Sequence, residues 1–482
     1  MEKLYSLSAT QMKDLLDKKE VSSVEITKSV IERIENTDKD IQAYISYNFE
    51  NALKAAENVD KKIASGEKIG AMAGIPVAVK DNMCTKGLRT TAASKMLGNF
   101  VPPYNATVVE RLIDSDAIII GKTTMDEFAM GSSGENSAFQ IARNPWDTTR
   151  VPGGSSSGSA ATVAASQVPV ALGSDTGGSI RQPASLTGIV GMKPTYGSVS
   201  RYGLIAFGSS LDQIGPMART VDDAALLFKT VSGYDEKDAT SKHYEYKGYG
   251  DSVKGMKLGI PKQYFGDGIS AVVKEKVYAA VEKLKELGAE VVEVSLPSTD
   301  YALSAYYIIS SAEASSNLGR FDGVKYGYSG SKRGNLEELY LSSRSEGFGA
   351  EVQRRIMLGT YVLSSGFYDA YYKKAKALQK MIAKEFDDAL KVCDAIITPL
   401  SPTTAFKIGE KSDDPLAMYA GDICTVTLNI AGLPGISVPC GFDSNNLPIG
   451  FQAIGRKFDE KTLLTIAKAY ENSVGGFAVK EF

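Results

Sequence analysis

The sequence has almost no histidine, since His243 is the only one in 482 residues. A histidine is the usual base that activates a serine nucleophile. His243 lies in the polar stretch SKHYEYKGYGD, which has no apolar periodicity and no neighbouring pattern of acidic residues. We therefore expect His243 to be a solvated loop residue. Any nucleophilic serine in this chain needs another group to take its proton.

Cysteine and long apolar runs are also scarce. The four cysteines form neither a CxxC pair nor a zinc-ligand spacing, and we expect small core or surface residues at Cys84, Cys393, Cys424 and Cys440. The start of the chain lacks the apolar region of a signal peptide, and no apolar run reaches the length of a membrane span. These absences predict a protein of the reducing cytoplasm, with no metal site and no membrane contact.

Charge of one sign is not concentrated anywhere. The net charge is −3, the pI is about 5.7, and Lys and Arg are scattered rather than grouped. A protein that binds a phosphate backbone directly needs a basic patch or stripe. We therefore predict no direct nucleic-acid binding, so any nucleic acid would have to be held by a partner.

Two glycine-rich stretches approximate a phosphate-binding loop, but each lacks a required residue. After Gly158, the residues Ser159 and Ala160 stand where that motif needs Lys and then Ser or Thr. The stretch at 121–123 reads Gly-Lys-Thr, but Asp116 stands where its first glycine should be. The sequence therefore predicts no nucleotide site and no bound cofactor.

Short apolar runs rich in β-branched residues alternate with helical patterns along most of the chain. The runs predict strands at 75–79, 117–120, 168–172, 395–398 and 436–438. Helices are predicted at 221–231 and 458–472, and a long one at 368–393 that packs on the sheet. Capping boxes at Ser8 and Ser22 predict helix starts near the N-terminus. This alternation predicts an α/β fold, a largely buried sheet with helices on both faces.

Gly, Ser and Thr concentrate between residues 131 and 185, in the segments GSSGENS, VPGGSSSGSAATVAAS and GSDTGGS. In the last segment Ser179 follows two glycines, an arrangement that holds a hydroxyl beside free backbone N–H groups. Turn formation and helix capping explain most clusters of this kind. Three such segments within a short range nevertheless indicate a site, with Ser179 as the candidate nucleophile.

Lys80 ends the apolar strand in GIPVAVKDN. Burial disfavours the charged ammonium, and a lysine made neutral in this way can act as a base toward serine. The alternative is a structural lysine that is ion-paired or reaches solvent with its amino group. The residues alone leave both interpretations open.

The motifs GIPVAVKDN, VPGGSSSGSAA and GSDTGGSIRQPAS resemble the amidase signature family. The resemblance implies a single large domain over 1–482 around a central mixed β-sheet covered by helices on both faces. Within it we expect an N-terminal helical segment at 1–65, the core motifs at 66–215 and an exposed excursion at 240–254.

The resemblance also implies a Ser–Ser–Lys triad. Lys80 takes and returns the proton, Ser155 passes it from a position next to a cis peptide bond, and Ser179 attacks. The backbone N–H groups of Thr176, Gly177, Gly178 and Ser179 would form the oxyanion hole. Asp175 and Arg181 flank this turn, and we expect them to brace the loop rather than to react.

Further segments, among them MDEFAMGSSGENS, RRIMLGTYVLSSGFYDAYY and AGLPGISVPCG, resemble the glutaminase subunits of tRNA-dependent amidotransferases. The resemblance implies that Arg355 binds the carboxylate of L-glutamine and Asp422 binds its ammonium group, while Ser132 and Ser133 line the site. A guanidinium can hold a carboxylate through two hydrogen bonds. As alternatives, Arg354 and Arg355 are surface charges, or a shift of one residue exchanges their roles, and Asp422 caps a helix.

We therefore expect a subunit that hydrolyses L-glutamine through a Ser179 ester and delivers ammonia to a partner. By the resemblance, the partner is a B subunit that binds mischarged tRNA and uses ATP and Mg²⁺ to amidate Glu-tRNA(Gln), Asp-tRNA(Asn) or both. A small C subunit joins the two. A free-standing amidase acting on other amides is the alternative, and Arg355 and Asp422 separate the two. A binding protein without turnover is a third possibility, which the presence of all three triad residues disfavours.

Overall fold

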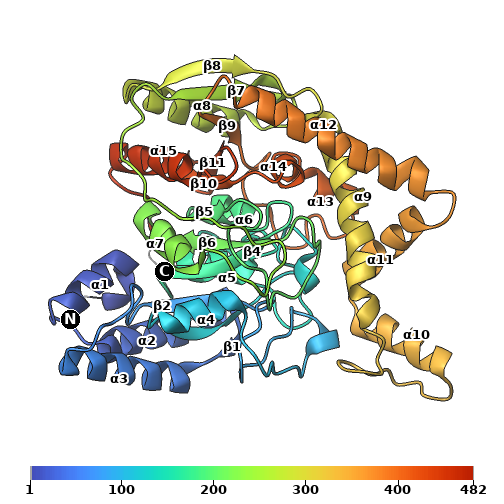
Figure 1. The fold of residues 1–482 in the computed structure, drawn as a ribbon, viewed down its shortest axis with the longest axis horizontal. Coiled ribbons are helices and arrows are strands. Elements are labelled where there is room, and N and C mark those ends of the chain that lie inside the picture. The colour runs from blue at the N-terminus through green and yellow to red at the C-terminus, as the bar shows by residue number, and fades with distance from the viewer. Residues whose placement is uncertain (1–2, 481–482) are drawn as a thin grey trace.

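The structure is a computed structural model that describes residues 3–480. Across this range an 11-stranded sheet runs through the molecule in the order β1-β3-β2-β4-β6-β5-β10-β11-β9-β7-β8, with β1 and β8 at opposite ends (Figure 1). Its strands are β1 (Tyr44–Tyr47), β2 (Pro76–Lys80), β3 (Ile118–Thr123), β4 (Val170–Asp175), β5 (Val190–Lys193), β6 (Gln213–Ala218), β7 (Lys257–Pro261), β8 (Glu290–Val294), β9 (Ala395–Pro399), β10 (Gly435–Phe442) and β11 (Pro448–Ile454). Parallel pairs form around β2 and around β7, and the other pairs are antiparallel. The sheet is therefore mixed, as expected.

Helices cover both faces of this sheet (Figure 1). They are α1 (Ala9–Asp17), α2 (Ser23–Ile41), α3 (Phe49–Ser65), α4 (Thr107–Asp114), α5 (Ser157–Ala164), α6 (Arg181–Thr187), α7 (Val221–Val231), α8 (Ala271–Glu286), α9 (Thr299–Asn317), α10 (Leu336–Gly347), α11 (Ala350–Leu363), α12 (Lys373–Ala389), α13 (Pro415–Ala420), α14 (Val426–Ala431) and α15 (Glu460–Ser473). Side chains of β2 alternate between the two faces. Val77 and Val79 join a core with α1, α4, α7, α8 and α15, whereas Ala78 joins a core with α2, α3 and α5. This is the fold class that the sequence predicts.

The elements expected from the sequence are present. The strands β2, β3, β4, β9 and β10 occupy the five apolar runs, and α7 and α15 occupy the two predicted helical segments. Ser8 and Ser22 both form complete capping boxes at the starts of α1 and α2. In the segment 368–393, a π-helical turn at Tyr368–Tyr372 precedes α12.

The expected packing of that last helix on the sheet is wrong. In Figure 1 α12 crosses α9 near the upper end of α9, and both belong to a cluster of buried side chains that also contains α14. Ile382 and Phe386 of α12 face this cluster, to which the sheet contributes Ile396 and Ile454. The apolar face of α12 is therefore covered mainly by α9 and α14.

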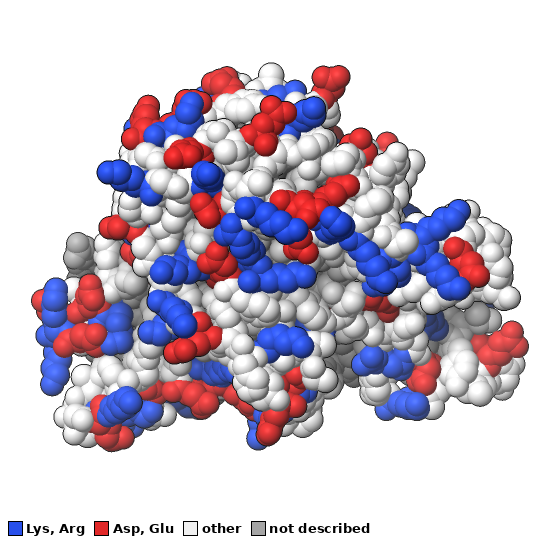
Figure 2. All heavy atoms as spheres, turned by 45° about the horizontal axis from the view of Figure 1, so that its top comes forward, with Lys and Arg blue, Asp and Glu red and all other residues white. Residues whose placement is uncertain are grey.

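The surface agrees with the scattered charge of the sequence. On the face shown in Figure 2, Lys and Arg side chains are interspersed with Asp and Glu side chains. Within residues 3–480, no helix combines the length and apolar character that crossing a bilayer requires.

The order of the strands determines where the candidate motifs meet. The parallel strands β2 and β4 are neighbours in the sheet. Their carboxyl ends therefore lie at the same edge, and Lys80 ends β2 while Asp175 ends β4. The turn with Ser179 follows β4, and α5 begins two residues after Ser155. Open α/β sheets commonly bind ligands at the carboxyl ends of their strands.

Candidate active site

Lys80 is the centre of a buried cluster of hydroxyl groups. Its side chain is fully buried, and its Nζ donates hydrogen bonds to Ser155 Oγ at 2.8 Å and Ser156 Oγ at 2.9 Å. A third hydrogen bond of 3.0 Å goes to Ser174 Oγ, which also accepts one of 2.9 Å from the Asn82 side chain. Within residues 3–480, no side-chain carboxylate lies within ion-pair distance of Lys80.

This environment favours the neutral amine. Burial lowers the pKa of Lys80 to about 7, although the carboxylates of Asp126, Asp175 and Asp212 act in the opposite direction. A lysine with a pKa near 7 is neutral in part of the molecules at neutral pH and can accept a proton from a serine.

The segment that carries Ser155 is tied to the turn that carries Ser179. The peptide bond between Gly154 and Ser155 is cis. The Ser156 N–H donates a hydrogen bond of 3.1 Å to the Ser179 carbonyl oxygen. Ser156 Oγ accepts from the Ser174 N–H at 3.3 Å. The two serine-rich segments and the end of β4 therefore form one connected structure.

Ser179 is the most accessible member of the proposed triad. It is 8% exposed, whereas Lys80 and Ser155 are both 0% exposed. Among the described residues the Ser179 hydroxyl has no hydrogen-bond partner. In particular, it forms no hydrogen bond with Ser155 Oγ. The structure thus brings Lys80 and Ser155 into direct contact and leaves the Ser179 hydroxyl free.

The turn before Ser179 presents unpaired backbone donors. The N–H groups of Thr176, Gly177 and Ser179 donate no hydrogen bond within the described part of the chain. The Gly178 N–H differs, because it donates a hydrogen bond of 2.8 Å to Asp175 Oδ1. A Cβ atom on Gly177 would overlap the ring of Tyr306, so only glycine fits there. Free N–H groups beside a nucleophile can stabilise a developing oxyanion.

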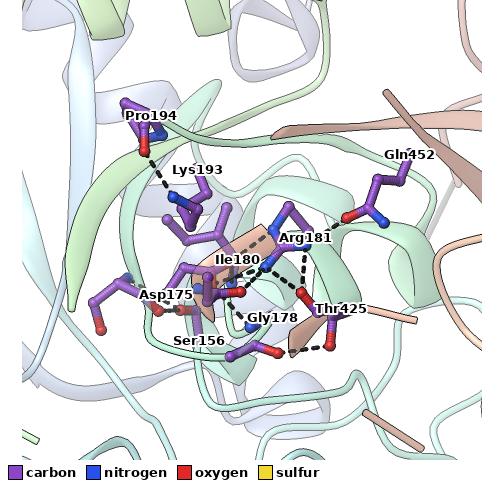
Figure 3. Close-up of polar contacts among 12 residues, drawn as sticks. Ser156, Asp175, Gly178, Ile180, Arg181, Lys193, Pro194, Thr425 and Gln452 are labelled. Atoms are coloured by element: carbon purple, nitrogen blue, oxygen red, sulfur yellow. Dashed lines mark hydrogen bonds and ion pairs between the residues drawn. The ribbon is translucent and has the colours of Figure 1, made fainter. Parts of the chain in front are cut away.

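Asp175 and Arg181 hold this turn in place through hydrogen bonds. Figure 3 shows Arg181 extending toward Asp175 and toward Thr425. Arg181 Nε donates to Asp175 Oδ2 at 3.0 Å, and its Nη1 donates to the Thr425 carbonyl oxygen at 3.2 Å. Burial alone would raise the pKa of Asp175, but the Arg181 guanidinium lowers it to about 2. Asp175 is therefore held in its charged form by its partner Arg181, which agrees with a structural role.

Arg355 is buried, whereas Arg354 is exposed and pairs with Oε2 of Glu351. The side chain of Arg355 is 4% exposed, compared with 44% for Arg354. The guanidinium carbon of Arg355 lies 4.4 Å from the ring centre of Tyr307 and 4.8 Å from that of Tyr419. Its Nε donates to Glu351 Oε1 at 2.6 Å, while its buried Nη1 has no partner within residues 3–480. Arg355 can therefore still bind an anion.

Asp422 is connected to Arg355 through one tyrosine. The Tyr307 hydroxyl donates a hydrogen bond of 2.7 Å to Asp422 Oδ2, and the same ring lies against Arg355. Burial raises the pKa of Asp422, while the hydroxyls of Tyr307 and Ser132 and the charge of Arg355 act in the opposite direction. A buried cation and a buried carboxylate thus lie on either side of Tyr307.

Asp422 is also connected to the turn at Ser179. Its carbonyl oxygen accepts a hydrogen bond of 3.1 Å from Thr425 Oγ1, which lies 2.6 Å from the Gly177 carbonyl oxygen. The helix α14 begins after Thr425 and has no side-chain cap. Asp422 is therefore not the cap of this helix, which was the structural alternative.

A cavity of about 180 Å³ brings Arg355 together with Ser132 and Ser133. Sites for drug-sized ligands are larger, on the order of 300–1,000 Å³. The remaining lining includes Arg354, Tyr419, Glu351 and Lys411, while Ser179 and Asp422 are not part of it. The cavity thus suits a small polar molecule held at its charged end.

Sequence reasoning missed two groups of this site. Ser174 lies next to Asp175, but nothing in the motif GSD indicates that its hydroxyl reaches Lys80. Tyr307 lies in an apolar helix, and its partner Asp422 is 115 residues away. The Ser156 hydroxyl, next to the proposed relay residue, also contacts Lys80 directly.

The other possible sites do not form. Lys122 of the stretch Gly-Lys-Thr is fully buried, and its Nζ donates 2.7 Å hydrogen bonds to the Met83 carbonyl oxygen and Thr90 Oγ1. His243 is exposed, as expected, and stacks on Tyr234 with 4.0 Å between ring centres. Within residues 3–480, no group of three or more His, Cys, Asp or Glu side chains could hold a metal ion.

Comparisons with known proteins identify the family of this chain. A family model described as Amidase matches residues 25–464. The A subunit of the glutamyl-tRNA(Gln) amidotransferase of Thermoanaerobacter pseudethanolicus is 56% identical over 474 residues, which cover 98% of this chain and 97% of that protein.

Two solved structures show the same fold over nearly the whole chain. The crystal structure of the A subunit of the glutamyl-tRNA(Gln) amidotransferase from Thermotoga maritima has a TM-score of 0.81 and 44% identity, and the match covers 97% of this chain and 95% of that one. The peptide amidase from Stenotrophomonas maltophilia has a TM-score of 0.83 and 30% identity, with 99% of each chain covered. The chain therefore belongs to the amidase family.

Proposed function

We propose that this chain is the glutaminase subunit of a tRNA-dependent amidotransferase. The observation that carries the proposal is the pair of buried charges formed by Arg355, with its unpaired Nη1, and Asp422, joined through Tyr307. An α-amino acid amide supplies a carboxylate for the one and an ammonium group for the other. A neutral amide would supply no anion for the buried Nη1 of Arg355 and no cation for the buried Asp422, which is costly.

The reaction begins with neutral Lys80. As Ser179 Oγ attacks the side-chain amide carbon of L-glutamine, its proton passes to Ser155, and the Ser155 proton passes to Lys80. The free N–H groups of the turn stabilise the oxyanion. When the C–N bond breaks, the proton returns through Ser155 to the leaving nitrogen, which departs as ammonia and leaves a glutamyl ester on Ser179.

Water completes the cycle. It attacks the ester, gives up a proton to the same Ser155–Lys80 pair, and glutamate leaves as Ser179 regains its hydrogen. The contact between Ser155 and Ser179 that this route needs is expected to form when substrate fills the site, because catalytic hydrogen bonds often tighten only in the complex.

The ammonia needs a partner, because ammonia released into water is protonated and lost as a nucleophile. The name shared by the relatives supports a B subunit that binds mischarged tRNA and activates its acyl group with ATP and Mg²⁺, and a C subunit that joins the two. The acceptor would be Glu-tRNA(Gln), Asp-tRNA(Asn) or both, and the complex would work in the cytoplasm. The mixed surface charge of this chain supports leaving tRNA binding to the partner.

Ammonia release from L-glutamine tests the proposal. The purified chain is assayed alone and with B and C subunits from the relative's complex, with and without mischarged tRNA and ATP. We expect release that rises with partner and tRNA, and that disappears in Ser179→Ala and Lys80→Met. Glutamine turnover that survives in Ser179→Ala would contradict the mechanism, and the absence of any response to the partners would favour a free-standing amidase.

A further inference from the structure

A buried carboxylate next to the Gly154–Ser155 segment takes no part in the reaction described above. Asp126 follows β3 and is 0% exposed. Its Oδ2 accepts a hydrogen bond of 3.0 Å from the Gly134 N–H, and its Oδ1 accepts one of 3.0 Å from the Asn136 N–H. Both donors belong to the loop that presents Ser132 and Ser133 to the cavity. The carboxylate therefore holds the substrate loop by its backbone.

The same residue contacts the turn that carries Ser155. The Asp126 N–H donates a hydrogen bond of 3.2 Å to the Ser155 carbonyl oxygen. A Cβ atom on Gly154 would overlap Asp126 Oδ2, and one on Gly131 would overlap its Cγ. The carboxyl group therefore packs directly against Gly154 on one side and against the start of the substrate loop on the other.

Asp126 is also the leading negative charge that acts on Lys80. The carboxylate of Asp126 favours the charged form of Lys80 more strongly than the carboxylates of Asp175 and Asp212 do. Asp175 is already paired with Arg181. Among residues 3–480, no cation is hydrogen-bonded to Asp126, whose side-chain partners are the two N–H groups of the substrate loop.

The remaining charges near this pair are otherwise engaged. Asp212 accepts hydrogen bonds from Thr176 Oγ1 at 2.6 Å and from the Gly208 N–H at 3.0 Å. Asp81, next to Lys80 in the chain, lies 3.5 Å from Lys122. Glu135 is the further acidic group that acts on Asp126, and burial raises the pKa of Asp126 to about 7, while its two N–H donors and Lys80 act in the opposite direction.

We propose that Asp126 is a positioning residue that couples the substrate loop to the catalytic base. Its two backbone hydrogen bonds fix the loop that presents Ser132 and Ser133. Its own N–H holds the carbonyl of Ser155, whose hydroxyl contacts Lys80. The proposal rests on the assignment of Lys80 as the base. A change in the substrate loop is thereby transmitted to the base through one carboxylate.

The variant Asp126→Asn removes the charge with little change in volume. Without the carboxylate the Lys80 ammonium loses its main stabilising charge, so the acid limb of the pH profile moves to lower pH by about one unit. Asparagine offers one acceptor oxygen to two N–H groups, so the KM for L-glutamine rises roughly tenfold. The matched control is Glu127→Gln. Glu127 is also buried, and it accepts hydrogen bonds from Ser94 Oγ at 2.5 Å and from the Gly349 N–H at 2.8 Å. It is not among the charges that act on Lys80.

Two readouts separate this proposal from the proposed function. The first is kcat/KM for L-glutamine against pH. The second is the rate at which a fluorophosphonate labels Ser179, measured by mass spectrometry as a function of pH. In this reaction the serine oxygen displaces fluoride from phosphorus, and the serine proton goes to the base. Suppose that the acid limb of the Ser179 labelling profile shifts in Asp126→Asn but the protein does not turn over L-glutamine. This result would support the coupling between Asp126 and Lys80 and would contradict the glutaminase assignment.

An unshifted acid limb in folded Asp126→Asn, or an equal shift in Glu127→Gln, would overturn the proposal. Folding is checked by near-ultraviolet circular dichroism and the melting temperature. If Asp126→Asn does not fold, Asp126→Ser removes the same charge with a smaller side chain and must give the same shift. Failure of both variants to fold would assign the carboxylate to folding alone and would also overturn the proposal.

Discussion

The ring of Tyr307 lies 4.4 Å from the guanidinium carbon of Arg355, while its hydroxyl donates a 2.7 Å hydrogen bond to Asp422. One side chain therefore positions both charged groups that we assign to the substrate. In Tyr307→Phe the ring remains beside Arg355, but Asp422 loses its neutral donor. We expect the KM for L-glutamine to rise about fivefold, the equivalent of about 1 kcal/mol, with kcat little changed.

Steady-state kinetics of Tyr307→Phe and Tyr419→Phe check this assignment. The Tyr419 hydroxyl donates to Glu351 at 2.7 Å rather than to Asp422. A larger effect of Tyr419→Phe than of Tyr307→Phe would show that Asp422 does not meet the substrate.

The activity should depend on pH through Lys80. Its pKa is lowered to about 7 by burial. Below that pH the ammonium form dominates and cannot accept the serine proton, so kcat/KM should rise with pH through about 7 and level off above it. A rise that continues toward the ordinary lysine pKa of about 10.4 would show that burial does not make Lys80 neutral.

The buried pair of Arg181 and Asp175 should matter for stability. Both side chains are 0% exposed and lie 3.0 Å apart. In Arg181→Met the Asp175 charge is left buried without its partner, which should cost about 3–5 kcal/mol of unfolding free energy. Urea unfolding measures the change. The exposed pair Lys373–Asp369 is the control, and Asp369→Asn should leave the unfolding midpoint unchanged.

Gly177 should tolerate no side chain. A Cβ atom there overlaps the Tyr306 ring, so Gly177→Ala must shift the backbone whose N–H groups we assign to the oxyanion. We expect kcat to fall roughly 100-fold or more, with a smaller effect on KM. The double variant with Tyr306→Ala restores space and should recover part of kcat. No recovery would mean that the loss has another cause than this overlap.

The sequence predicted those strands whose buried residues form a continuous apolar run. β2 and β4 are buried along their whole length and therefore read as continuous apolar runs. β8 was not predicted, because this edge strand alternates Glu with Val and is largely exposed. β5 and β6 were not predicted either, since glycine, lysine and proline interrupt their apolar character.

The candidate site divides in the same way. Lys80, Ser155 and Ser179 lie in compact motifs, whereas Tyr307 and Asp126 act through contacts that only the folded chain creates. The sequence left open whether Arg354 or Arg355 faces inward. In the structure, the rotation of α11 about its axis places Arg355 between the rings of Tyr307 and Tyr419. An error of one residue in a sequence-based helix prediction would instead place Arg354 on this side.

The central claim is that the site selects a charged amino acid amide. The most direct test compares kcat/KM for L-glutamine and for a neutral amide of similar size in the wild type, Arg355→Ala and Arg354→Ala. The account predicts a preference for L-glutamine that falls at least 100-fold in Arg355→Ala and is retained in Arg354→Ala, because the Arg354 side chain at the edge of the cavity is 44% exposed. Equal turnover of the neutral amide in the wild type, unaffected by Arg355→Ala, would contradict the account and indicate an amidase with another substrate.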